Sequence, residues 1–550
     1  MLNRRTFLTM SAASGSLAVI RPIQVLGSRQ RTSAEFYGVH QFIENNPDAV
    51  FIMRTSVDDL NNFDAIREAG LTFSRAVFVP KSEADGGVPI TNKVAVKPNL
   101  TSRGQWHASL LGYKYGEIPY EMTLGIVTHP YFTEGVIAGI QELGVSGSQI
   151  YINEKNGLKE EGDYPAMAER AGLPAGNVGT SGSILLDTPE GSQWFEQIKY
   201  LYPFNADDTF YLNLAKFKTH EMGITLSAKN IQGTCNTGYV NHCNPWNDTV
   251  SMPGRYTMIE GAREMIYALW ERHVSEGYWG WETPPAESDY DDYTGLGMET
   301  WAQRNIDNNI TSKVNLHIVE GIIGRDGNFN VGPHPVELNG ETRYIANDIL
   351  SNIIIFGKKS YHVDIIGAWL SGNEPGNFGL FRIALERGVI SDINPAHIPV
   401  YEITADSQII ARSLTDFQRF ELRSDYLNSL GEGADPGETE WKLINDPYDY
   451  GSVTAVNKTD EKPQAIVLSQ NHPNPFNPNT SIEYRLPRGG NVRLEIFNRS
   501  GQLVDMLVDG YRDQGSHMAT WNTGNFASGT YFYRLRFGGF TETRKMTVLK

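Results

Sequence analysis

Lys216, Lys218 and His220 follow directly after a short apolar run at residues 210–214, which predicts a buried strand. Lysine and histidine side chains that converge at one place suit an anionic ligand, such as a carboxylate, a phosphate or a metal-bound oxyanion. In an open α/β sheet, ligands bind outside the carboxyl ends of the strands, which is where these three residues are expected. The alternative is a solvated strand exit followed by an ordinary loop histidine.

Other polar side chains follow or end further apolar runs along the chain. They are Lys97, Asn99, Glu154, Glu320, His362 and Asp364. Carboxylates, lysines and histidines that end successive strands can form a metal site or an acid–base site where the strands meet. The alternative is that charged residues end strands simply because strands end at water.

The elements that would position these residues alternate between strands and helices from about residue 35 to 445. Short apolar runs predict strands at 50–53, 93–96, 150–152, 314–319 and 353–356. Amphipathic periodicity predicts helices at 130–143 and 378–390. This alternation predicts an α/β domain with a mostly parallel sheet.

Length and charge limit the classes of protein that fit. A chain of 550 residues is too long for one ordinary core, so two or three domains are expected. The net charge of -17 argues against a nucleic-acid binder and favours a soluble, extracellular protein. No apolar run is long enough to span a bilayer, so no transmembrane anchor is expected in the mature chain.

Residues 1–30 have the composition of an export signal, with Arg4 and Arg5 before a weakly apolar stretch. Together with Thr6, Phe7 and Leu8, this pair resembles a twin-arginine signal peptide, which implies the twin-arginine translocase as a partner. The protein would then cross the inner membrane in a folded state. An ordinary amphipathic N-terminal helix is the alternative.

Several ordered blocks of residues 31–445 resemble the domain of unknown function 362 family. The blocks are VAVKPNL (94–100), THPYFTEGVIAGIQELG (128–144), KFKTHEMGITLSAKNIQG (216–233), LHIVEGIIGRDGNFNVGP (316–333) and residues 344–375. By this resemblance, the following residues match the family's motif positions: Lys97, Asn99, Lys218, His220, Lys229, Asn230, Glu320, Gly332, Pro333 and Asp364. The family has no settled activity, so the resemblance implies a fold and no reaction.

The chain departs from this family in two ways. Glu320 stands where the family usually has aspartate, and the ferredoxin-type cysteine clusters of some members are missing. Cys235 and Cys243 are the only cysteines, too few for an iron–sulfur cluster. In an exported protein they are expected to form a disulfide. Free thiols, or thiols that bind a metal together with His242, are the alternative.

Residues 446–465 lack periodicity and predict a linker to a separate β module at 466–550. Apolar residues alternate with polar ones in SIEYRL and TYFYRLRF, which predicts a small antiparallel Ig-like β-sandwich. The phrases HPNPFNPNTSIEYRLP, ASGTYFYRLRFGG and ETRKMTVLK resemble the type IX secretion C-terminal sorting domain. This resemblance implies the type IX secretion machinery as a partner and a secreted or cell-surface location, reached through the periplasm. An Ig-like adhesion module is the alternative.

These observations favour an enzyme that acts on a small anionic substrate. Lys97, Asn99, Lys216, Lys229 and Asn230 would bind the anion. Lys218 and His220 would form the catalytic centre together with Glu320. His220 would act as general acid and base or as a metal ligand. Glu320 and Asp364 would bind a divalent metal or orient the histidine. The rival hypotheses are a non-catalytic surface protein that binds an anionic ligand and a structural surface component.

Overall fold

The computed structural model describes residues 35–100, 122–155, 164–220, 223–235, 295–327, 330–338, 340–423 and 467–548, the last with short gaps, and a few positions at 108–119, 448 and 450. The chain divides into two compact units, Met1–Tyr450 and Gly451–Lys550. This division falls within the stretch expected to be a linker. Each unit has its own apolar core.

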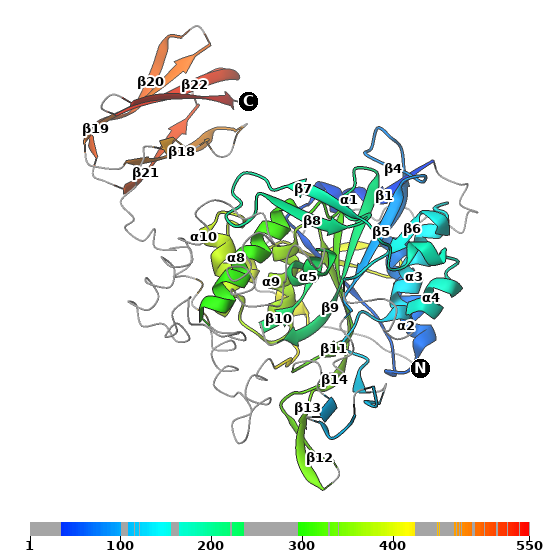
Figure 1. The fold of residues 1–550 in the computed structure, drawn as a ribbon. Helices are drawn as coiled ribbons and strands as arrows, with labels where there is room; N and C mark the ends of the chain where they lie inside the picture. The colour runs from blue at the N-terminus through cyan, green and yellow to red at the C-terminus, as the bar shows by residue number, and fades with distance from the viewer. Residues whose placement is uncertain are drawn as a thin grey trace, which may run out of the picture. The chain divides into compact units, whose positions relative to one another are not determined.

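A nine-stranded sheet forms the centre of the first unit (Figure 1). Its strand order is β16-β15-β2-β14-β11-β9-β5-β6, and β10 pairs with β9. The strands are β2 (Val50–Arg54), β5 (Lys93–Pro98), β6 (Ile150–Ile152), β9 (Thr209–His220), β10 (Gly223–Thr225), β11 (Leu316–Arg325), β14 (Asp348–Gly357), β15 (Val400–Ile403) and β16 (Ile409–Arg412).

The direction of the strands is mostly parallel, as the sequence predicted. Strands β15, β2, β11, β9, β5 and β6 run the same way, whereas β14, β16 and β10 run against them. β14 lies in the middle of the sheet, antiparallel to both β11 and β2. The carboxyl end of β14 therefore lies at the opposite edge of the sheet from the carboxyl ends of β5, β9 and β11.

Helices cover both faces of this sheet (Figure 1). The helices are α1 (Gln41–Asn45), α2 (Phe63–Val77), α3 (Pro130–Gln141), α4 (Tyr164–Arg170), α5 (Ser227–Asn230), α8 (Gly295–Thr311), α9 (Ser360–Leu370) and α10 (Gly379–Glu386). α2 and α3 pack on one face, where Phe132 and Val136 join Leu212 and Ile318 in the main core. α5 and α9 lie on the other face, where Tyr211 packs with Ile231. We call these two sides the α3 face and the α5 face.

Three smaller sheets also lie within the described part of the first unit. They are β3-β1-β4, built from β1 (Phe36–Val39), β3 (Phe78–Lys81) and β4 (Val88–Pro89), and the hairpins β7-β8 (Ser183–Asp187, Gln197–Leu201) and β12-β13 (His334–Leu338, Glu341–Ile345). The β12-β13 hairpin connects β11 to β14 and so begins at the carboxyl end of β11.

The second unit contains two antiparallel sheets, in the orders β17-β18-β21 and β20-β19-β22-β23. The strands are β17 (Val467–Leu468), β18 (Asn479–Leu486), β19 (Gly490–Asn498), β20 (Leu503–Arg512), β21 (Gly515–Asn522), β22 (Gly529–Phe537) and β23 (Phe540–Val548). Side chains that alternate along these strands, such as Ile482, Tyr484 and Tyr533, are buried in a common core. The predicted all-β module is therefore present.

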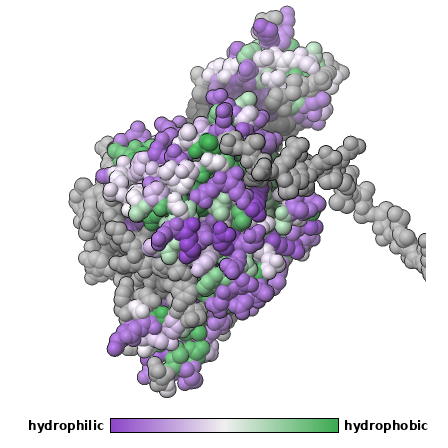
Figure 2. Space-filling model, turned by 90° about the vertical axis from the view of Figure 1, so that its right-hand side faces the viewer, coloured by the Kyte–Doolittle hydropathy of each residue, from purple (hydrophilic) through white to green (hydrophobic). Residues whose placement is uncertain are grey.

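The surface in Figure 2 mixes hydrophilic and hydrophobic residues on the part of that face that the structure describes. In the first unit, Leu185 and Tyr344 are the large apolar side chains that are exposed among the described residues. None of the described helices is both long and apolar enough to cross a membrane.

Candidate functional site

The predicted cationic residues are buried, and they lie within a strand. β9 continues to His220 and so includes Lys216 and Lys218, which the sequence placed beyond the end of the strand. The exposed fractions are 0% for Lys216, 3% for Lys218 and 2% for His220. The alternative of a solvated strand exit is therefore wrong. β9 lies between β5 and β11, and all three are parallel, so their carboxyl ends meet at one edge of the sheet.

Alternation along β9 divides the candidate residues between the two faces of the sheet. Successive strand residues point to opposite faces. Asn213 pairs in register with Lys97 and lies on the α5 face, where its amide donates to Ser227 of α5. Lys216 is three residues further and lies on the α3 face, in register with Glu320. The sequence predicted one cluster at the strand ends. The structure shows two clusters there, one on each face of the sheet.

The α3-face cluster is centred on a buried ion pair. Lys216 Nζ lies 2.5 Å from Glu320 Oε2, and both side chains are fully buried. Glu320 Oε2 also accepts from the backbone N–H of His129, and Oε1 accepts from those of Ile322 and Ile323. Because protein donors contact both carboxylate oxygens, Glu320 is suited to hold Lys216 in place.

The α5-face cluster begins with a second buried ion pair, between Lys97 and Glu154. Lys97 Nζ also donates to Asn230 Oδ1 at 3.0 Å. Asn99 Nδ2 donates to the same oxygen, also at 3.0 Å. Burial lowers the pKa of Lys97, the Glu154 carboxylate opposes this effect, and the charge of Lys229 adds to it. The structure therefore brings Lys97, Asn99 and Asn230 into direct contact and places Lys229 close to them.

Asn230 connects this group to the middle of the sheet. Its Nδ2 donates to the Lys97 carbonyl and to Asn213 Oδ1, at 3.2 and 2.7 Å. Asn213 Nδ2 in turn donates to the Ser227 carbonyl at 2.9 Å and lies 3.0 Å from His317 Nδ1. Burial lowers the pKa of His317 to about 3, so the ring is neutral and Nδ1 can accept this bond. A continuous buried hydrogen-bond network thus links β5, β9, β11 and α5.

Asp364 lies on the α5 face, where it binds the start of α5. Its Oδ1 accepts from the backbone N–H of Ser227 at 2.7 Å and from the Ser227 hydroxyl, and its Oδ2 accepts from Ala228 N at 2.8 Å. Burial raises the pKa of Asp364 to about 7, although these hydrogen bonds oppose the shift. Glu320 lies on the opposite face of the sheet, so the structure does not bring these two carboxylates together.

His362 and Asp364 were expected beside the other strand ends, and the structure contradicts this expectation for His362. The strand before them, β14, is antiparallel to its neighbours, so its end lies at the other edge of the sheet. His362 Nδ1 lies 2.7 Å from the carbonyl of Asp48, just before the start of β2. Asp364 lies further along α9, where it contacts Ser227 at the start of α5.

Lys218 and His220 lie on β9, closer to its carboxyl end than Lys216. Lys218 is in register with Arg325 of β11 and with Thr225 of β10, and His220 is in register with Gly223. Thr225 is 1% exposed, and its hydroxyl has no hydrogen-bond partner. A buried hydroxyl beside Lys218 is a polar group that a ligand could satisfy.

The predicted metal ligands do not converge. No group of three His, Cys, Asp or Glu side chains among the described residues is arranged to bind a metal ion, and His220, Glu320 and Asp364 are all described. Cys235 is buried, and burial raises the pKa of its thiol to about 12. His242 and Cys243 lie outside the described residues, so the Cys235–Cys243 disulfide stays a prediction.

Sequence reasoning missed several polar residues that build the site. They are His129, Asn213, Thr225, Ser227 and His317. Two of them left a signal in the sequence, because Asn213 and His317 each stand between two apolar residues within a strand. An amide or imidazole in such a position must find a buried partner. That signal alone could not identify the partner.

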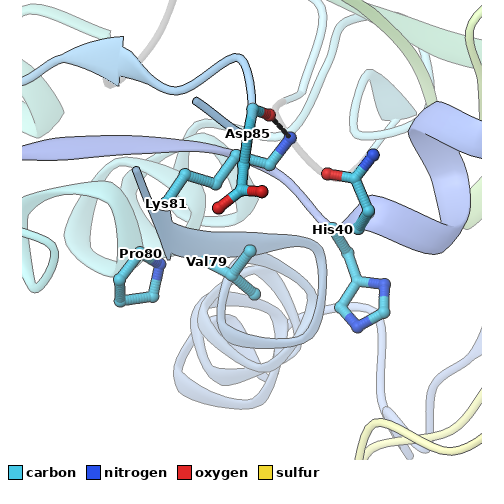
Figure 3. A pocket seen from close by; sticks show the side chains of 6 residues that line it. His40, Val79, Pro80, Lys81 and Asp85 are labelled. Carbon is cyan, nitrogen blue, oxygen red and sulfur yellow. Dashed lines mark hydrogen bonds between the residues drawn. The ribbon is translucent and has the colours of Figure 1, made fainter. Parts of the chain in front are cut away.

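One surface hollow lies apart from these clusters. Its lining residues are His40, Gln41, Val79, Pro80, Lys81 and Asp85 (Figure 3). Lys81 Nζ donates to the Asp85 carbonyl at 3.3 Å, and His40 Nδ1 accepts from the first turn of α1. Because Lys81 and His40 already contact local backbone, this hollow is a weaker candidate than the buried clusters.

Comparison with known proteins identifies two regions of the chain. Residues 94–352 match the family described as Domain of unknown function (DUF362), and residues 471–549 match the Secretion system C-terminal sorting domain. No curated protein and no solved structure matches the chain. The first match includes both ion pairs but supplies no activity. The second indicates a secreted or cell-surface protein that uses the type IX secretion machinery.

Proposed function

We propose that the α/β unit is a secreted enzyme that acts on a small anionic substrate at the carboxyl ends of β5, β9 and β11. The observation that carries this proposal is the burial of three lysines, Lys97, Lys216 and Lys218, at these ends. Removing an ammonium group from water is costly, so proteins bury lysines mainly where a carboxylate or a ligand compensates. Glu154 and Glu320 form buried ion pairs with Lys97 and Lys216 and so hold these two ammonium groups at the strand ends.

Within this proposal, Lys218 binds the anionic group and His220 transfers a proton. Imidazole is the side chain whose ordinary pKa is best suited to proton transfer near neutral pH. Glu320 positions Lys216, and Glu154 positions Lys97, instead of acting as bases. A divalent metal ion bound together with the substrate stays a prediction, and elemental analysis of protein purified without chelators checks it.

A thermal-shift measurement tests anion binding. Full-length protein is melted with phosphate, citrate, malate and glycerol 3-phosphate, and at least one anion is expected to raise Tm. Lys218→Ala should abolish that shift. Lys313→Ala is the matched control, because Lys313 is 52% exposed and pairs only with the exposed Asp207. The proposal fails if no anion raises the Tm of the wild type, or if Lys218→Ala keeps the full shift.

Turnover separates the enzyme from the alternative, a non-catalytic cell-surface protein that binds an anionic ligand. The anion that stabilises the protein is incubated with it, and its consumption is followed by mass spectrometry. An enzyme consumes the anion, and His220→Ala slows consumption by about 10²-fold or more while binding persists. Binding without consumption supports the alternative.

Export through the twin-arginine translocase is also part of the proposal. Its support is the pair Arg4 and Arg5 ahead of a weakly apolar stretch, which lies outside the described residues. Replacing both arginines with lysine should leave the precursor in the cytoplasm. Unchanged secretion would show that another route is used. The Ig-like classification of the C-terminal unit likewise stays a prediction, supported by its two antiparallel sheets.

A further inference from the structure

One acceptor in the α5-face network has no donor. Asn99 is 7% exposed, and its Oδ1 is buried without a hydrogen-bond partner. A buried carbonyl oxygen without a donor costs about 1–3 kcal/mol. In native proteins such atoms occur where a water or a ligand completes the site.

The orientation of this amide is fixed from one end of the network by Lys97. An ammonium group can only donate, so the Asn230 atom that Lys97 Nζ contacts must be the oxygen. Asn99 must therefore present its Nδ2 to that oxygen, as the structure shows. Rotating the Asn99 amide would place two oxygens against each other.

The other end of the network fixes the same orientation independently. The Ser227 carbonyl can only accept, so the Asn213 atom that contacts it must be Nδ2. Asn213 Oδ1 then accepts from Asn230 Nδ2, which also donates to the Lys97 carbonyl. Asn230 Oδ1 again faces Lys97 and Asn99. Both ends of the network therefore leave Asn99 with an unsatisfied acceptor.

We propose that Asn99 Oδ1 accepts a hydrogen bond from the substrate, so that the substrate is an anion that also carries a hydroxyl or amino group. The inference rests on the proposed function, because it takes the lysines as the site of the anionic group. Lysine ammonium groups only donate and so bind anionic oxygens, whereas Asn99 Oδ1 only accepts and so needs a hydrogen. A carboxylate or phosphate ester that is fully deprotonated and has no other polar group cannot satisfy both, whereas a hydroxy acid, an amino acid or a phosphorylated polyol can.

Such a site discriminates against an analogue without the donor. When that analogue binds, the Asn99 oxygen remains buried and unpaired, and the penalty lowers affinity. One hydrogen bond of this kind corresponds to about a 10-fold preference. The affinity of the anion without a hydroxyl or amino group should depend little on Asn99.

Calorimetric titration of the full-length protein with matched anion pairs tests this inference. The pairs are malate with succinate, aspartate with succinate, and glycerol 3-phosphate with propyl phosphate. The wild type should bind the hydroxylated or amino member at least about 10-fold more tightly in the pair that fits the site. Asn99→Leu removes the acceptor at similar volume and should abolish the preference, whereas Asn61→Leu on an exposed asparagine should preserve it.

The outcomes separate this inference from the proposed function. If the wild type binds no anion, the proposed function fails. If anions bind with equal affinity within every pair, or if Asn99→Leu keeps the preference, this inference is overturned and a water satisfies Asn99 Oδ1. The comparison of pairs in the wild type decides the matter even if Asn99→Leu fails to fold. Asn99→Gln, which keeps the amide but moves it, then serves as the second variant and should also lose the preference.

Discussion

Lys216 and Glu320 form a buried ion pair, with 2.5 Å between Nζ and Oε2 and no exposed surface on either side chain. The two residues are 104 positions apart in the chain and meet because β9 and β11 are parallel neighbours. We expect Lys216→Met to lower the free energy of unfolding by about 3–5 kcal/mol, because it leaves the carboxylate buried without its counter-ion. Chemical denaturation measures this loss.

Two further variants control for the charge itself. Lys313→Met removes an exposed lysine and should change the free energy of unfolding by less than ~0.5 kcal/mol. The double variant Lys216→Met/Glu320→Leu should recover part of the loss, since no unpaired charge remains. A cost below ~1 kcal/mol for Lys216→Met alone would contradict the structural role given to this pair.

Gly233 packs directly against the Lys97–Glu154 pair. A Cβ on Gly233 would lie 2.3 Å from Glu154 Oε1 and 2.7 Å from Lys97 Cε. Gly233→Ala is therefore expected to displace the ion pair, destabilise the protein by about 1–3 kcal/mol and weaken anion binding. Gly176→Ala is the control, because a Cβ there meets no atom within 4 Å. Equal stability of the two variants would show that the pair shifts without cost.

The network through His317 predicts a loss of stability in acid. The pKa of His317 is about 3 in the folded protein, below its ordinary value of 6.5. Above about pH 6.5 the ring is neutral in both states, and the contribution is complete. Below that pH the unfolded chain binds a proton that the folded protein excludes, so the free energy of unfolding falls towards pH 3.

His317→Phe isolates this effect, because phenylalanine does not titrate. The difference in free energy of unfolding between wild type and variant should shrink as pH falls from about 7 to 4. Asp364 titrates with the opposite sign, since its pKa of about 7 favours the folded state in acid. Taking the difference between wild type and His317→Phe cancels that contribution. A constant difference across the range would rule out a neutral, buried His317.

Removal of residues 466–550 should separate sorting from folding. The α/β unit and the C-terminal unit have separate cores, so the truncated protein is expected to unfold cooperatively near the Tm of the intact α/β unit. Without the sorting domain it should accumulate in the periplasm and not reach the cell surface. Fractionation followed by immunoblotting checks the location. Surface display of the truncated protein would show that the tail is not required.

The sequence by itself determined the alternating α/β organisation and the positions of six strands in the central sheet, which are β2, β5, β6, β9, β11 and β14. The apolar runs at 93–96, 150–152 and 353–356 became β5, β6 and β14, because a buried strand needs a continuous apolar run. The helix expected at 130–143 is α3. The C-terminal sorting domain could also be recognised from its phrases, since alternating residues determine which side chains enter its core.

Only the tertiary structure decided which candidate residues meet. Strand direction cannot be read from an apolar run, so nothing in the sequence showed that β14 is antiparallel and directs His362 away from the other strand ends. The length of β9 also depended on distant residues, because Lys216 stays buried within a strand only when Glu320 supplies its counter-ion. Once β9 continues to His220, its two-residue alternation places Asn213 and Lys216 on opposite faces of the sheet, which is why one predicted cluster became two.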